Sequence, residues 1–96
     1  YAFYVENSDT LQAIDISGDS GCVTPTDASI ADGSYPLSRA LYIYVNTDKA
    51  AENQPLSDFV DYYLSDEGLA AVADAGYVDL PASEIQATRD AWENSK

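Results

Sequence analysis

The chain has 96 residues, and 17 acidic against four basic side chains give it a formal charge of −13 at pH 7. This balance disfavours nucleic acid and anionic membrane surfaces as partners, because four scattered cations form no basic patch. A hydrophobic content of 46% is ample for a packed core and argues against disorder. No apolar run approaches the ~18 residues that a membrane-spanning helix needs.

The first residues predict a strand, then a helix, then a second strand. Residues 1–5, "YAFYV", are rich in aromatics and typical of a short strand. With no initiator Met and no signal peptide, the chain reads as though it starts partway through that strand, so we expect a piece of a longer protein. Residues 6–14 favour a short helix capped by Asn7 or Ser8, and "AIDIS" after it favours a strand.

Residues 17–34 read as a loop that holds one helical turn. Thr24 can cap that turn, Pro25 suits its first position, and Gly33 ends it. Within the loop, "GDSG" is similar to the nucleophile loop of trypsin-like serine proteases. The chain contains no histidine to act as the base, so a flexible turn is the favoured interpretation. The missing histidine also argues against a zinc site, and a phosphate-cradling loop would need a lysine after its glycines.

Three residues of this region, Asp15, Ser17 and Asp19, have the spacing of a calcium-binding loop. Ser20 stands where such a loop requires glycine, and Thr26 stands where it requires a bidentate glutamate. With two required features missing, the sequence does not predict a metal site here.

Cys22 is the only cysteine of the chain. It can be a small buried residue, a reactive thiol, or half of a disulfide whose partner lies outside this chain. Its polar, glycine-rich surroundings, "SGDSGCVTP", disfavour an inert buried thiol. The disulfide interpretation requires a location outside the cytoplasm.

Residues 35–45, "YPLSRALYIYV", form the most apolar stretch of an acidic chain. Pro36 cannot donate a ladder hydrogen bond and therefore belongs at the start of a strand. Leu41 to Val45 have no polar face, which predicts a strand covered on both sides, as in an α/β protein. Arg39 can either reach an anionic ligand or anchor the strand by pairing with a carboxylate or a helix end, and the many acids favour the structural role.

After a polar turn at residues 46–54, the pattern becomes helical. Apolar residues recur at helical spacing in one stripe, namely Leu56, Phe59, Val60, Tyr63 and Leu64. Ser65 is expected to cap a second helix that ends at Gly76, and "YVDLP" is expected to be extended. Ser83 and Gln86 have the spacing of a capping box for a last helix through Trp92.

The carboxylates are dispersed and offer no acid–base pair. Five of them are most simply read as a solvated surface: Asp58, Asp61, Asp66, Glu67 and Asp74. The eight tyrosines are read as packing residues rather than as a platform for stacking a ligand. These residues indicate no enzyme chemistry and no cofactor.

Three blocks of the chain, in this order and at these separations, resemble the C-terminal third of the phosphate-binding proteins of ABC transporters. They are "YAFYVENSDTLQAIDI", "GCVTPTDASIADGSYPLSRALYIYVN" and "LSDFVDYYLSDEGLAAVADAGYVDLP". The resemblance covers roughly residues 1–81, and the middle block is its most specific part. One departure is Ala40, where the family commonly has a proline after the arginine.

The resemblance implies an α/β architecture, the C-terminal portion of a type II periplasmic-binding-protein fold, with a crossing strand followed by helices. On that analogy, residues 1–34 end the second lobe, residues 35–45 cross between the lobes, and residues 46–96 complete the first lobe. Arg39 is then an anchor at the hinge. Cys22 fits a protein of the periplasm or cell surface, secreted and in some members lipid-anchored.

The same resemblance implies capture of inorganic phosphate for an ABC importer, with the membrane permease as partner. The family's phosphate ligands lie upstream of these residues, so no ligand-binding residue is assigned within this chain. The alternative is a binding-protein-like domain used for sensing or surface interaction, or a binder of another oxyanion.

Overall fold

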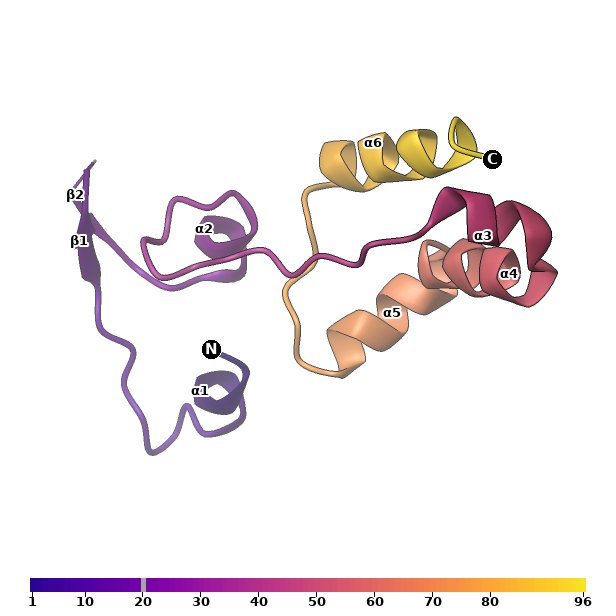
Figure 1. Cartoon of the computed structure of the whole chain (residues 1–96). Coiled ribbons are helices and arrows are strands. Elements are labelled where there is room, and N and C mark those ends of the chain that lie inside the picture. The colour runs from indigo at the N-terminus through magenta and orange to yellow at the C-terminus, as the bar shows by residue number, and fades with distance from the viewer. Residues whose placement is uncertain (20) are drawn as a thin grey trace.

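The computed structural model describes residues 1–19 and 21–96. The Cα radius of gyration is 16.5 Å, with extents of 48 × 29 × 18 Å. A compact chain of this length would have a radius of gyration of about 13 Å. Figure 1 shows why: one group of elements lies at each end, and a long connector joins them.

The N-terminal group holds two short helices and a hairpin. Its elements are α1 (Ala2–Glu6), β1 (Ile16–Gly18), β2 (Gly21–Val23) and α2 (Asp27–Ala31). The strands β1 and β2 pair antiparallel, with Ile16 opposite Val23 and Ser17 opposite Cys22. The mixed helix and sheet content is consistent with a piece of an α/β periplasmic-binding fold.

The strand expected at residues 1–5 is wrong, because these residues form helix α1. The helix expected at residues 6–14 is also wrong: residues 7–10 form turns, and residues 11–15 are irregular. The side chain of Asn7 donates to the carbonyl of Phe3 at 2.8 Å and so bonds the end of α1. Aromatic residues favour strands only where a neighbouring strand offers a surface to pack on, and no described segment does so here.

The helical turn expected in residues 17–34 is confirmed as α2, but its cap lies two residues later than expected. Thr26, not Thr24, accepts from the backbone N–H of Ser29 at 3.1 Å. The Ser29 hydroxyl in turn accepts from the Thr26 N–H at 2.9 Å, which completes a capping box. Gly33 follows the helix with a φ of +76°, a conformation that glycine adopts without strain.

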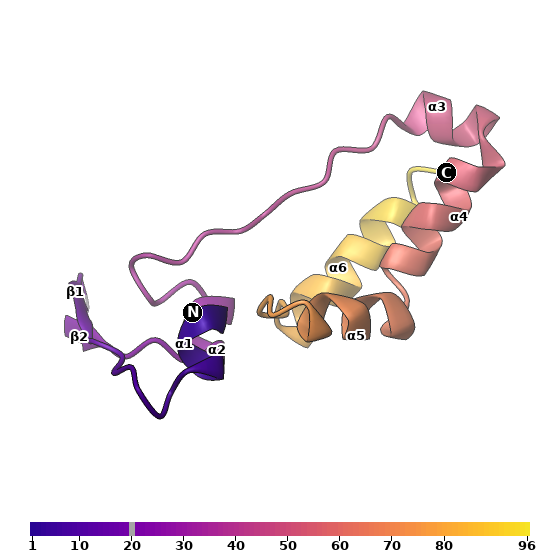
Figure 2. The same cartoon turned by 90° about the horizontal axis from the view of Figure 1, so that it is seen from below.

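The expected strand at residues 35–45, covered on both sides, is not observed: the backbone N–H of Ser38 donates to the carbonyl of Tyr35 at 2.9 Å and closes a turn, and residues 39–45 form a connector without regular structure. The rings of Tyr42 and Tyr44 lie on the same side of the segment, 6.4 Å apart, and these residues are 75% and 93% exposed. No described segment pairs with the connector, and Figure 2 shows it spanning the space between α2 and α3. A strand forms only where a neighbour completes its hydrogen bonds, so the apolar pattern alone was insufficient.

The C-terminal group is entirely helical in its regular elements. It comprises α3 (Thr47–Glu52), α4 (Gln54–Tyr63), α5 (Asp66–Asp74) and α6 (Ala82–Glu93). Helix α3 replaces the polar turn expected there, because the Asn46 side chain caps it by accepting from the N–H of Lys49 at 3.0 Å. The helices expected from the apolar stripe of residues 56–64 and from the Ser65 cap are confirmed.

The last helix is confirmed, but its capping box is wrong. Helix α6 begins after Pro81, with no side-chain cap. Gln86 instead donates to the carboxylate of Asp90 one turn further along, at 2.8 Å. The helix already includes Ser83, so Ser83 is not the N-cap residue, and Pro81, which precedes the helix, has no side-chain acceptor with which to cap it.

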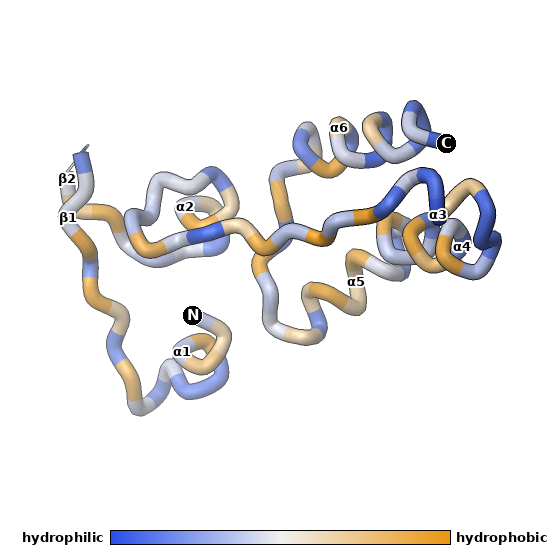
Figure 3. Tube along the Cα trace, viewed as in Figure 1, coloured by the Kyte–Doolittle hydropathy of each residue, from blue (hydrophilic) through white to orange (hydrophobic). Residues whose placement is uncertain are grey.

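The core lies within the helical group and is small. Ala50, Val60 and Trp92 are buried, and three partly buried side chains pack against them: Val45, Leu56 and Leu64. Figure 3 shows hydrophobic residues continuing along the connector, outside this core. The accessible surface is 7185 Å², against about 5,400 Å² for a compact protein of this mass. About 1,800 Å² is thus exposed beyond the ordinary amount.

Among the helices of the described residues, none combines the length and the apolar character needed to cross a bilayer.

Candidate functional site

The most connected polar cluster of the described residues lies where α6 packs over the turn between α4 and α5. Ser65 starts α5 by accepting from the N–H of Gly68 at 3.1 Å, and its hydroxyl donates to the Tyr62 carbonyl at 2.7 Å. These two hydrogen bonds of the Ser65 hydroxyl fix a sharp corner between α4 and α5. Leu64 and Asp66, on either side of Ser65, are thereby held facing α6.

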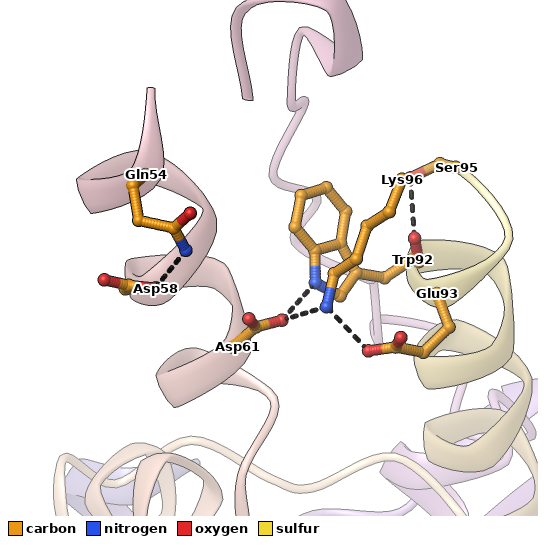
Figure 4. Close-up of polar contacts among 7 residues, drawn as sticks. All are labelled: Gln54, Asp58, Asp61, Trp92, Glu93, Ser95 and Lys96. Atoms are coloured by element: carbon orange, nitrogen blue, oxygen red, sulfur yellow. Dashed lines mark hydrogen bonds and ion pairs between the residues drawn. The ribbon is translucent and has the colours of Figure 1, made fainter. Parts of the chain in front are cut away.

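At this corner, Asp61 of α4 binds two donors from the end of the chain (Figure 4). The indole Nε1 of Trp92 donates to Oδ1 of Asp61 at 2.6 Å, and Nζ of Lys96 donates to the same oxygen at 2.7 Å. Lys96 also pairs with Glu93 at 2.8 Å, and its ammonium lies 5.2 Å from the centre of the Trp92 ring. Trp92, which is 8% exposed, is the apolar centre of the cluster.

These contacts shift two ionisation equilibria. The hydrogen bond from Lys96, followed by that from Trp92, lowers the pKa of Asp61 below its usual value. The hydrogen bonds to Asp61, and then to Glu93, raise the pKa of Lys96. Both groups therefore remain charged throughout the neutral range.

Arg89 joins α6 to the same corner. Its Nε donates to the backbone carbonyl of Leu64 at 2.8 Å, and its Nη2 donates to Asp66 at 2.7 Å. The Leu64 carbonyl lies at the C-terminal end of α4, where helices leave carbonyls without partners and where a cation is favourable. Arg89 thus satisfies a helix end and a carboxylate together.

A hollow of about 340 Å³ opens beside this cluster, lined by Asp61, Leu64, Arg89, Trp92, Glu93 and Lys96. Both of its cations already bind carboxylates of the chain, so neither is presented to an incoming anion. Its carboxylates are bound to cations or the indole in turn. The arrangement is suited to holding α6 in place, and it presents no nucleophile–base or acid–base pair.

A second hollow, of about 600 Å³, lies between α1, α2 and the end of α5. Ala2 of α1 lies close to Gly76 there, since a Cβ built on Gly76 would be 2.9 Å from the Ala2 Cβ. Desolvation, followed by the nearby Asp27, raises the pKa of Tyr1. The charged residues that line this hollow are all carboxylates, namely Glu6, Asp27, Asp74 and Asp79, which disfavours an anion.

The two residues singled out in the sequence lie elsewhere. Cys22 is an exposed free thiol on β2. Arg39 is exposed in the connector, and it forms no ion pair or hydrogen bond with another described residue. The structure therefore brings neither residue into the α4–α5–α6 cluster, and the disulfide and anchor roles stay predictions.

The sequence lacks two features that a calcium-binding loop requires. Ser20 belongs to that stretch and to the "GDSG" similarity, and it lies outside the described residues. Over residues 1–19 and 21–96, no group of three or more acidic or thiol side chains is arranged to hold a metal ion.

All five carboxylates that the sequence assigns to a solvated surface are exposed, and three of them also bind other side chains of the chain. Asp61 and Asp66 bind Trp92, Lys96 and Arg89, and Asp58 accepts from Gln54 at 2.7 Å. The Asp61–Trp92 and Asp66–Arg89 partners are separated by 31 and 23 positions along the chain. No spacing rule within a helix connects residues that far apart.

The family is shown by comparison with known proteins. The model of the PBP superfamily domain matches residues 1–67, which is more than half of the chain. The chain therefore belongs to the PBP superfamily.

Individual relatives are similar over most of this chain. A protein of Staphylococcus saprophyticus named Phosphate-binding protein PstS is 46% identical over 85 residues, which are 88% of this chain and 26% of that protein. Proteins of the same name from Staphylococcus aureus and Staphylococcus epidermidis are 42% and 43% identical over 91 residues, 94% of this chain and 28% of each. The chain thus spans about a quarter of these relatives. No solved structure matches it significantly.

Proposed function

We propose that this chain is the C-terminal part of a binding protein that captures inorganic phosphate for an ABC importer. The observation that carries the proposal is the 42–46% identity, over 88–94% of the chain, to proteins named for phosphate binding. In this role the protein is a binder rather than an enzyme. Its partners are phosphate and the membrane permease, and it works in the periplasm or at the cell surface.

Within that protein, residues 1–34 would end the second lobe and residues 46–96 would complete the first. Residues 35–45 would cross between them as a strand whose apolar faces are covered by the rest of the fold. The excess exposed surface of about 1,800 Å² and the bare connector support this division, because a binding-protein lobe would bury them.

Phosphate itself would be held by residues outside this chain. Of the four cations, Arg89 and Lys96 are bound to carboxylates at 2.7 Å, and Lys49 lies 3.8 Å from Glu52. Arg39 remains exposed, and we assign it to the hinge as an anchor. Because local donors can hold an oxyanion despite a negative net charge, the charge of −13 is no objection.

The test uses calorimetry with inorganic phosphate on two proteins. The 96-residue chain alone is expected to give no binding heat. A chimera of the S. saprophyticus relative, in which these residues replace the matching 26% of that protein, is expected to fold and to bind phosphate as its parent does. A folded chimera without phosphate affinity would refute the proposed role, whereas binding by the 96 residues alone would refute the placement of the site.

The alternative is a sensing domain or a binder of another oxyanion. Anion binding by the native protein that carries these residues distinguishes it from the proposed function. If the proposed function is right, the native protein should bind phosphate, and an excess of sulfate should not displace it. Preference for sulfate, or no binding of either anion, would favour the alternative.

A further inference from the structure

The N-terminal and C-terminal groups of elements meet at a small contact. Ala2 of α1 lies against Gly76, the residue that follows α5 and its cap. A Cβ built on Gly76 would be 2.9 Å from the Cβ of Ala2, which is closer than such carbons approach one another in proteins. Glycine is therefore required at this position by its neighbour as well as by its φ of +86°.

The backbone of Gly76 is fixed by the end of α5. Its N–H donates to the carbonyl of Ala73 at 2.9 Å, and the N–H of Tyr77 donates to the carbonyl of Val72 at 3.3 Å. Both bonds satisfy carbonyls of the last turn of the helix, so this backbone cannot shift without opening the helix end. A side chain added at Gly76 would instead push α1 away.

The contact is not reinforced by polar bonds. Among the described residues, no hydrogen bond or ion pair joins the N-terminal group to the C-terminal group. The hollow of about 600 Å³ beside the contact is lined by carboxylates from both groups, Glu6 and Asp27 from the first and Asp74 and Asp79 from the second. Because like charges repel across such a gap, the two groups touch at this point without being bound to each other.

We propose that Ala2 and Gly76 form the pivot about which the two lobes of the binding protein turn as they close on phosphate. This inference rests on the proposed function, in which residues 1–34 and 46–96 belong to different lobes. Two-lobed binding proteins close around their ligands by turning about a few residues. A methyl group against a bare Cα lets two surfaces come close and turn, and no polar bond has to break.

A side chain at the pivot would change how the lobes meet. The Cβ of G76A would have to open the contact by about 0.5 Å to reach an ordinary carbon–carbon distance. A rotation about the pivot increases this displacement at the far ends of the lobes. Hydrogen bonds weaken steeply beyond their usual length, so the lobes of G76A should hold phosphate less tightly.

The first measurement asks whether Ala2 and Gly76 touch in the native protein that carries these residues, and it needs no phosphate. G76A is expected to lower the midpoint of urea denaturation, because its Cβ meets Ala2 and its φ is strained. A2G should also lower the midpoint, as glycine does in a helix. The double variant A2G/G76A should nevertheless have a higher midpoint than G76A, because the two Cβ atoms no longer collide. A midpoint equal to or below that of G76A would overturn the contact.

The second measurement is phosphate affinity by calorimetry, with G33A as the matched control. Gly33 has a φ of +76°, and a Cβ built there meets nothing within 4 Å, so G33A carries the same kind of backbone strain without a collision. G76A is expected to bind phosphate about ten-fold more weakly than the wild type, and A2G/G76A should recover most of this loss. G33A should stay within about two-fold of the wild type. G76A that binds as tightly as the wild type, or G33A that binds as weakly as G76A, would refute the pivot.

The third measurement separates a pivot from a contact that only stabilises the fold. Small-angle X-ray scattering should show a decrease in the radius of gyration of the wild type and of A2G/G76A when phosphate saturates the site. The decrease should be smaller for G76A, whose lobes cannot close fully. An equal decrease in all three proteins would contradict the pivot.

Failure of the proposed function would give a different result. A wild type that binds no phosphate would refute that function and the pivot together. A wild type that binds phosphate, with variants that bind it equally well, would refute the pivot alone.

Discussion

Trp92 and Asp61 are joined by a hydrogen bond of 2.6 Å from the indole Nε1 to the carboxylate Oδ1, across 31 positions of sequence. The bond fastens the last turn of α6 to the last turn of α4. Trp92 is the only tryptophan of the chain and one of three buried apolar residues. Its fluorescence therefore reports directly on whether α6 is docked.

The docking of α6 should depend on pH through Asp61. Lys96 and Trp92 hold the folded-state pKa of Asp61 below 3.8, so this contribution to stability is complete above that value and is lost as pH falls through the lowered pKa. Lys96 has a raised pKa, so its contribution is complete below 10.5 and is lost only as pH rises through the raised value. Trp92 emission should stay constant between these limits and shift to the red outside them.

The D61N variant provides the control for the acid limb. Asparagine retains an oxygen that can accept from the indole but loses the charge that pairs with Lys96. We expect α6 to be more easily undocked at neutral pH, with a weaker acid transition. An unchanged acid transition in D61N would show that other carboxylates govern the docking of α6.

Arg89 and Asp66 should contribute unequally although they form one ion pair. The Asp66 side chain is 92% exposed, whereas that of Arg89 is 32% exposed and also binds the Leu64 carbonyl. D66A should therefore change the free energy of unfolding by at most about 0.5 kcal/mol, as for other exposed pairs. R89A should cost about 1.5–3 kcal/mol, because it also leaves the end of α4 without its donor.

Urea denaturation followed by circular dichroism compares these two variants. R89K is informative as a third, since lysine keeps the charge but has no planar fork to reach both oxygens. It should behave more like R89A than like the wild type. Equal losses for D66A and R89A would mean that the ion pair, not the carbonyl bond, holds α6.

The parts of the structure that could be predicted from sequence are those set by local signals. The stripe from Leu56 to Leu64 and the cap at Ser65 depend on neighbours within one or two turns, and both are present. Gly76, expected at the end of α5, has the predicted positive φ, +86°.

The parts that could not be predicted depend on distant partners. Residues 1–5 carry the composition of a strand, yet with no strand beside them they form a helix. The same lack of a partner leaves residues 41–44 exposed. Asp61 is exposed as expected, but nothing in its local sequence indicates its bonds to Trp92 and Lys96.

Cys22 should be freely reactive in this chain. It is exposed on β2, and the chain has no second cysteine. A thiol-specific chromogenic reagent should modify it completely without denaturant, because the side chain is exposed. In a longer native protein in which it forms the predicted disulfide, the same reagent should act only after reduction. A native protein whose Cys22 reacts before reduction would contradict the disulfide.

The close contact of α4 and α5 depends on the absence of a side chain at Gly68. A Cβ built there would clash with the carbonyl oxygen of Tyr62 and lie 2.7 Å from that of Tyr63. These are backbone atoms at the end of α4, so they cannot move aside as a side chain would.

Replacing a helical glycine with alanine normally stabilises a helix by about 1 kcal/mol. At Gly68 we expect the opposite, a loss of about 1–3 kcal/mol from overpacking. A70G is the matched control, because it changes an exposed position two residues later and should cost only the propensity term of about 1 kcal/mol. Because the corner also orients Leu64 and Asp66, G68A should loosen α6 and shift Trp92 emission to the red, whereas A70G should not. G68A as stable as the wild type, with unchanged emission, would show that α4 and α5 can separate without disturbing α6.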